Sequence, residues 1–147
     1  MAQVWLVTGS SRGLGRAIVE AGLAAGNKVL ATARDIASLS DLAESYADQV
    51  KLFALNVTDE SAAACAVKTA IDAFGSLDVV INNAGYGNLS SVEDTPISDF
   101  RAQIETNLFG TIIVTKAASD LQDAGLIRLR NGASKASPKC CRAKWHR

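Results

Sequence analysis

Three glycines lie in a short turn near the start of the chain, directly after the apolar run at residues 4–7. Three residues separate Gly9 from Gly13 and one separates Gly13 from Gly15, a spacing that differs from the common Gly-x-Gly-x-x-Gly pattern. Gly9 permits a sharp exit from a strand, Gly13 lets an anion approach bare backbone, and Gly15 lets a helix pack closely. Because free amides at a helix N-terminus attract phosphate, the turn predicts a pyrophosphate site. The alternative is a glycine-rich turn without a ligand.

The residues of this turn expected to contact the ligand are Gly9, Ser11, Arg12, Gly13, Leu14 and Gly15, with Ser10 and Ser11 offering hydroxyl donors. Arg34 lies just past a second apolar run at residues 28–33. An acid at this place is typical of NAD binding, whereas an arginine favours the extra phosphate of NADP. Asp35 is predicted to cap the next helix instead of selecting NAD. NADP(H) is therefore favoured over NAD(H), and the alternative for Arg34 is a solvated surface side chain.

Strands and helices alternate along the chain in a way that would position this turn. The expected strands are residues 3–8, 28–33, 50–55 and 77–82, and the expected helices are 13–26, about 39–46, and one that Thr58 or Asp59 caps and that ends at Phe74. This alternation predicts an α/β fold with a doubly wound parallel sheet, incomplete at about four to five strands, and a ligand site at the carboxyl ends of the strands.

A long helical segment is expected from Pro96 to about Leu121. The apolar side chains predicted to face the sheet are Phe100, Ile104, Leu108 and the cluster from Ile112 to Val114.

Length and charge set the outer bounds. A chain of 147 residues suits one domain with a real core. It has no apolar run long enough to span a bilayer and no leading signal peptide, so a soluble, cytoplasmic protein is expected. Residues 1–127 hold eight of the fifteen basic residues and all fifteen acids, and the other seven basic residues follow. The expected division is a cofactor-binding domain at residues 1–121 and an irregular basic tail at 122–147.

Three motifs in order resemble the short-chain dehydrogenase/reductase family. They are the string from Thr8 to Gly15, Asn82-Asn83-Ala84-Gly85 after the fourth strand, and Thr106-Asn107 in the long helix. The resemblance covers residues 3–121 and implies a Rossmann-type sheet that binds a nicotinamide dinucleotide. It also implies hydride transfer between the nicotinamide and a small carbonyl or alcohol, and assembly as homo- or hetero-oligomers.

The resemblance implies roles for further residues. Asn56 and Val57 would lie beside the adenine, where the family commonly has Asp-Val. The residues expected to support the sheet and lie along the ribose are Asn83, Ala84 and Gly85. Asn107 resembles an asparagine that holds a water in the family's proton relay, an auxiliary catalytic role. The alternatives are turn formation for Asn82 and Asn83, and a buried amide at a helix bend for Asn107.

The family's catalytic serine and Tyr-x-x-x-Lys pair have no clear counterpart here. Tyr46 and Tyr86 are the only tyrosines, and Val50 and Ser90 stand four residues beyond them. A Tyr-Gly-Ala-Ser-Lys-Ala string of the family resembles residues 131–136, which begin with asparagine. Alternatively, residues 126–129 form a weak fifth strand and Ser134 is the substrate-side serine.

Two function classes therefore stay open. The first is an NADP(H)-dependent oxidoreductase, and the alternative is a non-catalytic nucleotide-binding remnant or a partner-binding protein. The basic tail fits an interaction arm for acidic partners, with nucleic acid disfavoured, or an out-of-frame or alternatively spliced ending. No metal site and no membrane association are predicted.

Overall fold

The computed structural model describes residues 2–123 as an α/β fold. The strands are β1 (Val4–Val7), β2 (Lys28–Ala33), β3 (Val50–Ala54) and β4 (Val79–Ile81). The helices are α1 (Gly13–Ala24), α2 (Ser40–Ser45), α3 (Glu60–Phe74), α4 (Ile97–Ile104) and α5 (Gly110–Asp123), together with a 3-10 turn η1 (Ile36–Leu39) and a π-helical segment η2 (Glu105–Phe109).

The four strands form one parallel sheet in the order β3-β2-β1-β4. The chain adds strands on one side of β1 and then crosses to its other side, so the strand order reverses between β1 and β4. In doubly wound sheets this reversal is where ligands bind. The predicted doubly wound fold is confirmed for the described residues, and the turn from Gly9 to Gly15 lies at the reversal.

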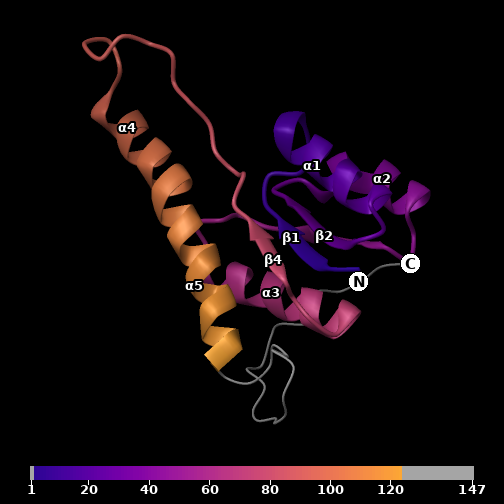
Figure 1. Cartoon of the computed structure of the whole chain (residues 1–147). Helices are drawn as coiled ribbons and strands as arrows, with labels where there is room; N and C mark the ends of the chain where they lie inside the picture. The colour runs from indigo at the N-terminus through magenta and orange to yellow at the C-terminus, as the bar shows by residue number, and fades with distance from the viewer. Residues whose placement is uncertain (1, 124–147) are drawn as a thin grey trace.

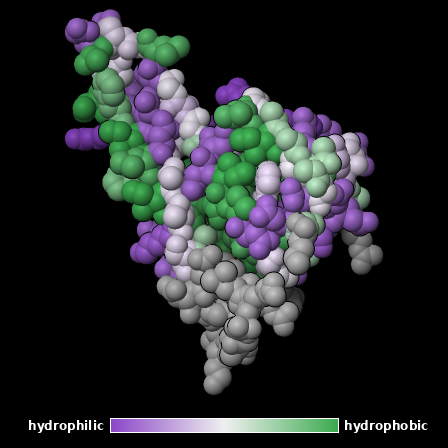
Figure 2. All heavy atoms as spheres, in the orientation of Figure 1, coloured by the Kyte–Doolittle hydropathy of each residue, from purple (hydrophilic) through white to green (hydrophobic). Residues whose placement is uncertain are grey.

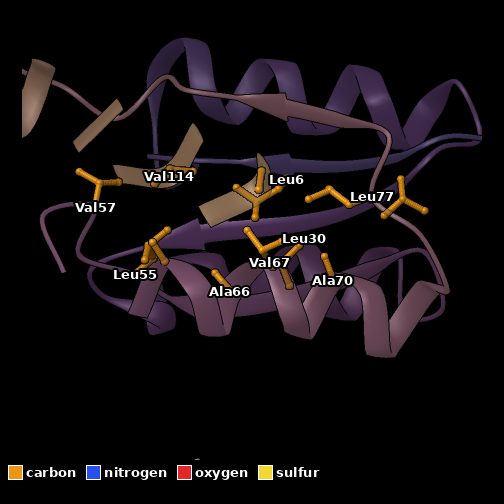
Figure 3. Packing of buried hydrophobic residues seen from close by; sticks show 12 residues of the cluster. Leu6, Leu30, Leu55, Val57, Ala66, Val67, Ala70, Leu77 and Val114 are labelled. Carbon is orange, nitrogen blue, oxygen red and sulfur yellow. The ribbon is translucent and has the colours of Figure 1, made fainter. Parts of the chain in front are cut away.

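Two hydrophobic clusters hold helices on the two faces of the sheet (Figure 1). Successive strand residues point to opposite faces. Leu6 and Leu30 therefore pack with α3 and α5, in the cluster drawn in Figure 3, and Val7 and Val29 pack with α1 and α2. Both leucines are fully buried, and burying such a side chain contributes about 1.5–3 kcal/mol.

Local signals set the helix ends much as the sequence predicts. Asp59 is the N-cap of α3, because its carboxylate accepts a hydrogen bond of 2.9 Å from the backbone N–H of Ala62. Gly75 ends this helix in the left-handed conformation, at a φ of 87°. Gly26 has a φ of 81° just beyond α1.

The predicted packing of the long helical segment is wrong for Ile104, Leu108 and Ile112, whereas Phe100 is half-buried. The segment runs from Ile97 to Asp123, interrupted by η2, but Ile104 and Leu108 are 50% and 53% exposed and Ile112 is also exposed. Only its second half is anchored, through Val114 in the core cluster beside α3. α4 extends beyond the sheet, whose last strand within residues 2–123 is β4 (Figure 1), so none of the described strands lies beneath these side chains.

Several predictions fall outside the described residues. These are the fifth strand at residues 126–129, the fragment at 131–136, and the basic tail beyond Asp123. Within the described part, none of the helices combines the length and the hydropathy needed to cross a bilayer.

Candidate functional site

A cavity of about 710 Å³ opens at the carboxyl ends of the four strands. Its walls come from the turn after β1 and the loops after β2, β3 and β4, with Ala102 and Thr106 added from the long helical segment. All the residues predicted to bind the cofactor line this cavity, namely Gly9, Ser11, Arg12, Gly13, Leu14, Gly15, Arg34, Asn56, Val57, Asn83, Ala84 and Gly85. The structure thus brings these residues together, and their contact with a cofactor stays a prediction.

The three glycines meet three different requirements of the turn. Gly9 has a φ of 67°, and a Cβ there would lie 2.8 Å from the Cα of Ala84. Gly13 has a φ of 59°, and a Cβ there would meet no heavy atom within 4 Å, so its backbone borders open space in the cavity. At Gly15 a Cβ would lie 2.3 Å from both the Asn83 Nδ2 and the Gly9 carbonyl oxygen. The turn is therefore tightly packed at Gly9 and Gly15 and open to the cavity at Gly13.

Thr8 and Asn83 lock this turn to the end of β4. The Thr8 Oγ1 accepts hydrogen bonds from the backbone N–H groups of Asn83 and Ala84, each at 3.0 Å. The Asn83 side-chain amide donates to the carbonyls of Thr8 and Gly9, at 3.0 and 3.1 Å. Asn83 therefore does more than end a strand, because it joins two walls of the cavity.

The two serines of the turn have different roles, which corrects the expectation that both offer donors to a ligand. Ser11 lines the cavity. Ser10 is fully buried and donates its hydroxyl to the Val7 carbonyl at 2.9 Å, while its backbone N–H donates to the Thr32 carbonyl at 2.8 Å. The hydroxyl of Ser10 therefore stabilises the strand ends.

The charges at the cavity favour an anion. Arg12 and Arg34 line it, and no aspartate or glutamate is among its lining residues. α1 has neither a side-chain N-cap bond nor an acid in its first turn, so its first amides stay available. Asp35 is confirmed as a cap, because its Oδ1 accepts a hydrogen bond of 3.0 Å from the backbone N–H of Ala37.

Asn56 and Val57 line the cavity at the end of β3. The Asn56 Oδ1 accepts hydrogen bonds from the backbone N–H and the hydroxyl of Thr58, at 3.3 and 3.1 Å. Val57 packs against the start of α5, where a Cβ at Gly110 would lie 2.5 Å from its Cγ2. The side-chain oxygen of Asn56 is thus occupied by hydrogen bonds from Thr58. Its NH2 group remains available to donate a hydrogen bond to a ligand.

Asn107 lies within the π-helical segment and does not line the cavity. Its Oδ1 accepts a hydrogen bond of 3.0 Å from the Tyr86 N–H, and its Nδ2 donates one of 2.7 Å to the Tyr86 carbonyl. The side chain is exposed, so the alternative of a buried amide is wrong. Asn107 thus contacts the backbone of Tyr86, a residue that does line the cavity.

Five lining residues were not among the predicted binding residues: Ala33, Leu55, Tyr86, Ala102 and Thr106. Ala33 and Leu55 directly precede predicted binding residues, and Tyr86 directly follows one, so strand ends alone could have indicated them. Ala102 and Thr106 are four residues apart on one helical segment, a spacing that places them on one face.

Comparison with known proteins agrees with this geometry. A family model described as short chain dehydrogenase matches residues 3–129. The chain is 49% identical over 118 residues to Oxidoreductase BOA17 of Botryotinia fuckeliana, covering 80% of this chain and 43% of that protein. It is 36% identical to a 3-oxoacyl-[acyl-carrier-protein] reductase of Synechocystis, covering 82% of this chain and 50% of that one. The chain thus spans about half the length, or less, of these curated relatives.

Solved structures give the same picture. A short-chain dehydrogenase from Streptomyces avermitilis superposes with a TM-score of 0.78 at 37% identity, over 85% of this chain and 46% of that chain. A structure of ElxO with NADP bound superposes with a TM-score of 0.76 at 29% identity, over 84% of this chain and 52% of that chain. With its parallel sheet, its glycine turn at the strand-order reversal and a family match over most of its length, this chain belongs to the short-chain dehydrogenase family.

Proposed function

We propose that the cavity binds NADP(H) in preference to NAD(H), as the cofactor site of an oxidoreductase. The observation that carries this proposal is the pair of arginines, Arg12 and Arg34, in a cavity with no acidic lining residue. A guanidinium binds a phosphate through paired, charge-assisted hydrogen bonds. The one acid near the end of β2, Asp35, uses its carboxylate to cap η1.

The rest of the cavity suits the remaining parts of a dinucleotide. The open backbone at Gly13 and the uncapped start of α1 suit the pyrophosphate. Asn56 and Val57 would contact the adenine, and the segment from Asn83 to Gly85 would lie along a ribose. A cavity of about 710 Å³ lies within the usual range of ligand sites.

When bound, the nicotinamide would supply or accept the hydride in the interconversion of a carbonyl and an alcohol. This chain's part is to hold the cofactor and to order the wall beside it. Asn107 fixes both backbone polar groups of Tyr86, so we propose it as an auxiliary residue that orders the wall after β4.

A second candidate for these 147 residues is cofactor binding without turnover. Tyr86 lines the cavity, but Ser90 stands four residues beyond it, where a lysine would be needed. A tyrosine exchanges a proton efficiently in catalysis when a positive charge beside it stabilises the phenolate, the role of the lysine in the family's Tyr-x-x-x-Lys pair. Asn131 stands where the fragment at residues 131–136 would need its tyrosine, and it lies outside the described residues.

Calorimetry with NADPH and NADH tests the binding proposal. Wild-type protein should bind NADPH more tightly, and Arg34→Ala should reduce NADPH affinity about tenfold or more while changing NADH affinity little. Lys116→Ala is the matched control, because it removes an exposed positive charge from α5 that does not line the cavity. Equal affinity of the wild-type protein for the two cofactors would refute the NADP preference.

NADPH oxidation across a panel of carbonyl compounds separates the two candidates. Turnover above the rate without protein would refute binding without catalysis. Binding of NADPH with no turnover across the panel would support it. Absence of binding to either cofactor would refute both.

A further inference from the structure

Arg16 on α1 forms ion pairs with two acidic side chains. The Arg16 Nη1 donates to the Asp41 Oδ1 at 3.0 Å, its Nη2 donates to the other Asp41 oxygen, and its Nε donates to the Glu20 Oε1 at 2.6 Å. The pairing with Asp41 is bidentate, the geometry that fixes a guanidinium most firmly. Within residues 2–123 it is the only ion pair that joins two different helices.

The two helices joined in this way follow the two arginines of the cavity. Arg12 lies one helical turn before Arg16, whose backbone N–H is 3.4 Å from the Arg12 carbonyl oxygen. Arg34 precedes η1, and η1 leads directly into α2, which carries Asp41. The ion pair therefore connects two segments, one from the glycine turn into α1 and the other from the end of β2 into α2. We call the two segments and the ion pair that joins them the bracket.

The segment between Arg34 and Asp41 is itself well fixed, so a restraint at one end reaches the other. The Asp35 carboxylate caps Ala37, and the Ser38 hydroxyl donates to the Asp35 carbonyl at 2.6 Å. Leu39 is fully buried in the cluster between the sheet, α1 and α2. These contacts hold the segment between Arg34 and Asp41 against the sheet.

Glu20 and Asp41 are both held by Arg16, and neither lines the cavity. The hydrogen bond from Arg16 lowers the pKa of Asp41, and the bonds to Asp41 and Glu20 raise the pKa of Arg16. No ion pair among the described residues involves Arg12 or Arg34, so both guanidinium groups are left to attract an external anion.

We propose that Arg16 and Asp41 are positioning residues that set the spacing of Arg12 and Arg34 and thereby the preference for NADP(H) over NAD(H). This inference rests on the proposed binding of NADP(H). NADH lacks the extra phosphate, so loosening the bracket should weaken NADPH binding selectively.

The test is the ratio of NADPH to NADH affinities, measured by calorimetry for wild type, Asp41→Asn and Asp41→Glu. Asp41→Asn keeps the side-chain shape and removes the charge, and we expect it to lower the ratio about two- to fivefold. Asp41→Glu keeps the carboxylate and should restore most of the ratio. Asp72→Asn is the matched control, because the side chains of Asp72 and Asp41 are 61% and 63% exposed. Asp72 also takes part in an ion pair, with Lys68 at 2.6 Å.

A lower ratio in Asp41→Asn alone, with the ratio kept in Asp41→Glu and Asp72→Asn, supports the proposal. An unchanged ratio in Asp41→Asn overturns it, as does an equal fall in NADPH and NADH affinity, which would indicate a structural role only. A wild-type protein that binds both cofactors equally would instead refute the NADP preference on which the inference rests.

Discussion

The two sides of the cavity are held in very different ways. The wall formed by the glycine turn rests on a buried strand, on close glycine contacts and on the bonds of Thr8 and Asn83. The wall formed by α4 and the preceding loop extends beyond the sheet, and Leu89 in that loop is fully exposed. Figure 2 shows hydrophobic surface along α4 and α5. The first wall is fixed by the sheet, whereas in the second wall the loop and the helical segment are joined to each other by side-chain bonds from Gln103 and Asn107.

The largest contrast should come from leucine truncation in the two regions. Leu6→Ala removes a fully buried side chain between the sheet and α3, and we expect it to cost about 2–5 kcal/mol of unfolding free energy. Leu108→Ala removes a side chain that is 53% exposed, and it should change stability by about 0.5 kcal/mol or less. Urea denaturation measures both. Similar losses of unfolding free energy in the two variants would mean that Leu108 is buried by another part of the protein or by a partner in solution.

A similar contrast is expected between two glycines. Gly15→Ala places a Cβ against Asn83 and the Gly9 carbonyl, and the overpacking should cost about 1–3 kcal/mol and weaken NADPH binding. Gly87→Ala is the control, since a Cβ there meets no atom within 4 Å, and it should cost about 0.5 kcal/mol or less. Thermal denaturation and NADPH titration of both variants provide the measurement. If Gly15→Ala proved as harmless as Gly87→Ala, the tight packing beneath the turn would be disproved.

The sequence predicted the first wall far better than the second. The second strand at residues 28–33, the Asp59 cap and the turn from Gly9 to Gly15 depend on neighbours in the chain or on a repeating apolar pattern, and all are found. The roles of Thr8 and Ser10 depend on which strand ends meet, and spacing alone does not give this. The π-helical segment around Asn107 has no periodic signal of its own.

The predicted packing of Ile104 and Leu108 failed for a related reason. Helical periodicity reports that a face is apolar, but it does not report what covers that face. Val114, ten residues beyond Ile104, follows the same pattern and is fully buried because α3 and the sheet lie beside it. The difference between these residues is set by the topology of the sheet.

The tie between the loop after β4 and the long helical segment can be cut at Asn107. Asn107→Ala removes both hydrogen bonds to the Tyr86 backbone, and we expect a loss of about 0.5–1.5 kcal/mol, because the site is exposed. The more specific effect should be on the Tyr86 amide, whose hydrogen exchange should accelerate. Gln103→Ala is the control, since it breaks one bond of 2.9 Å to the Asn88 N–H and leaves Tyr86 untouched. Unchanged exchange at Tyr86 in Asn107→Ala would show that the tie does not order the second wall.

The smallest expected effect is the pH dependence of the stability that the ion pair between Arg16 and Asp41 contributes. Arg16 lowers the pKa of Asp41 in the folded chain, so the contribution of the pair to stability is present above the unfolded pKa of about 3.9. It is lost as the pH falls through the lower folded pKa, while Arg16 stays charged throughout. The stability difference between wild type and Asp41→Asn should therefore be constant from pH 7 to about 5 and shrink below about pH 4. Thermal denaturation across this range, with Asp72→Asn to control for the loss of one surface carboxylate, provides the comparison. A difference that instead grew as the solution was acidified would contradict the charged pairing of Arg16 with Asp41, and with it the physical basis of the bracket.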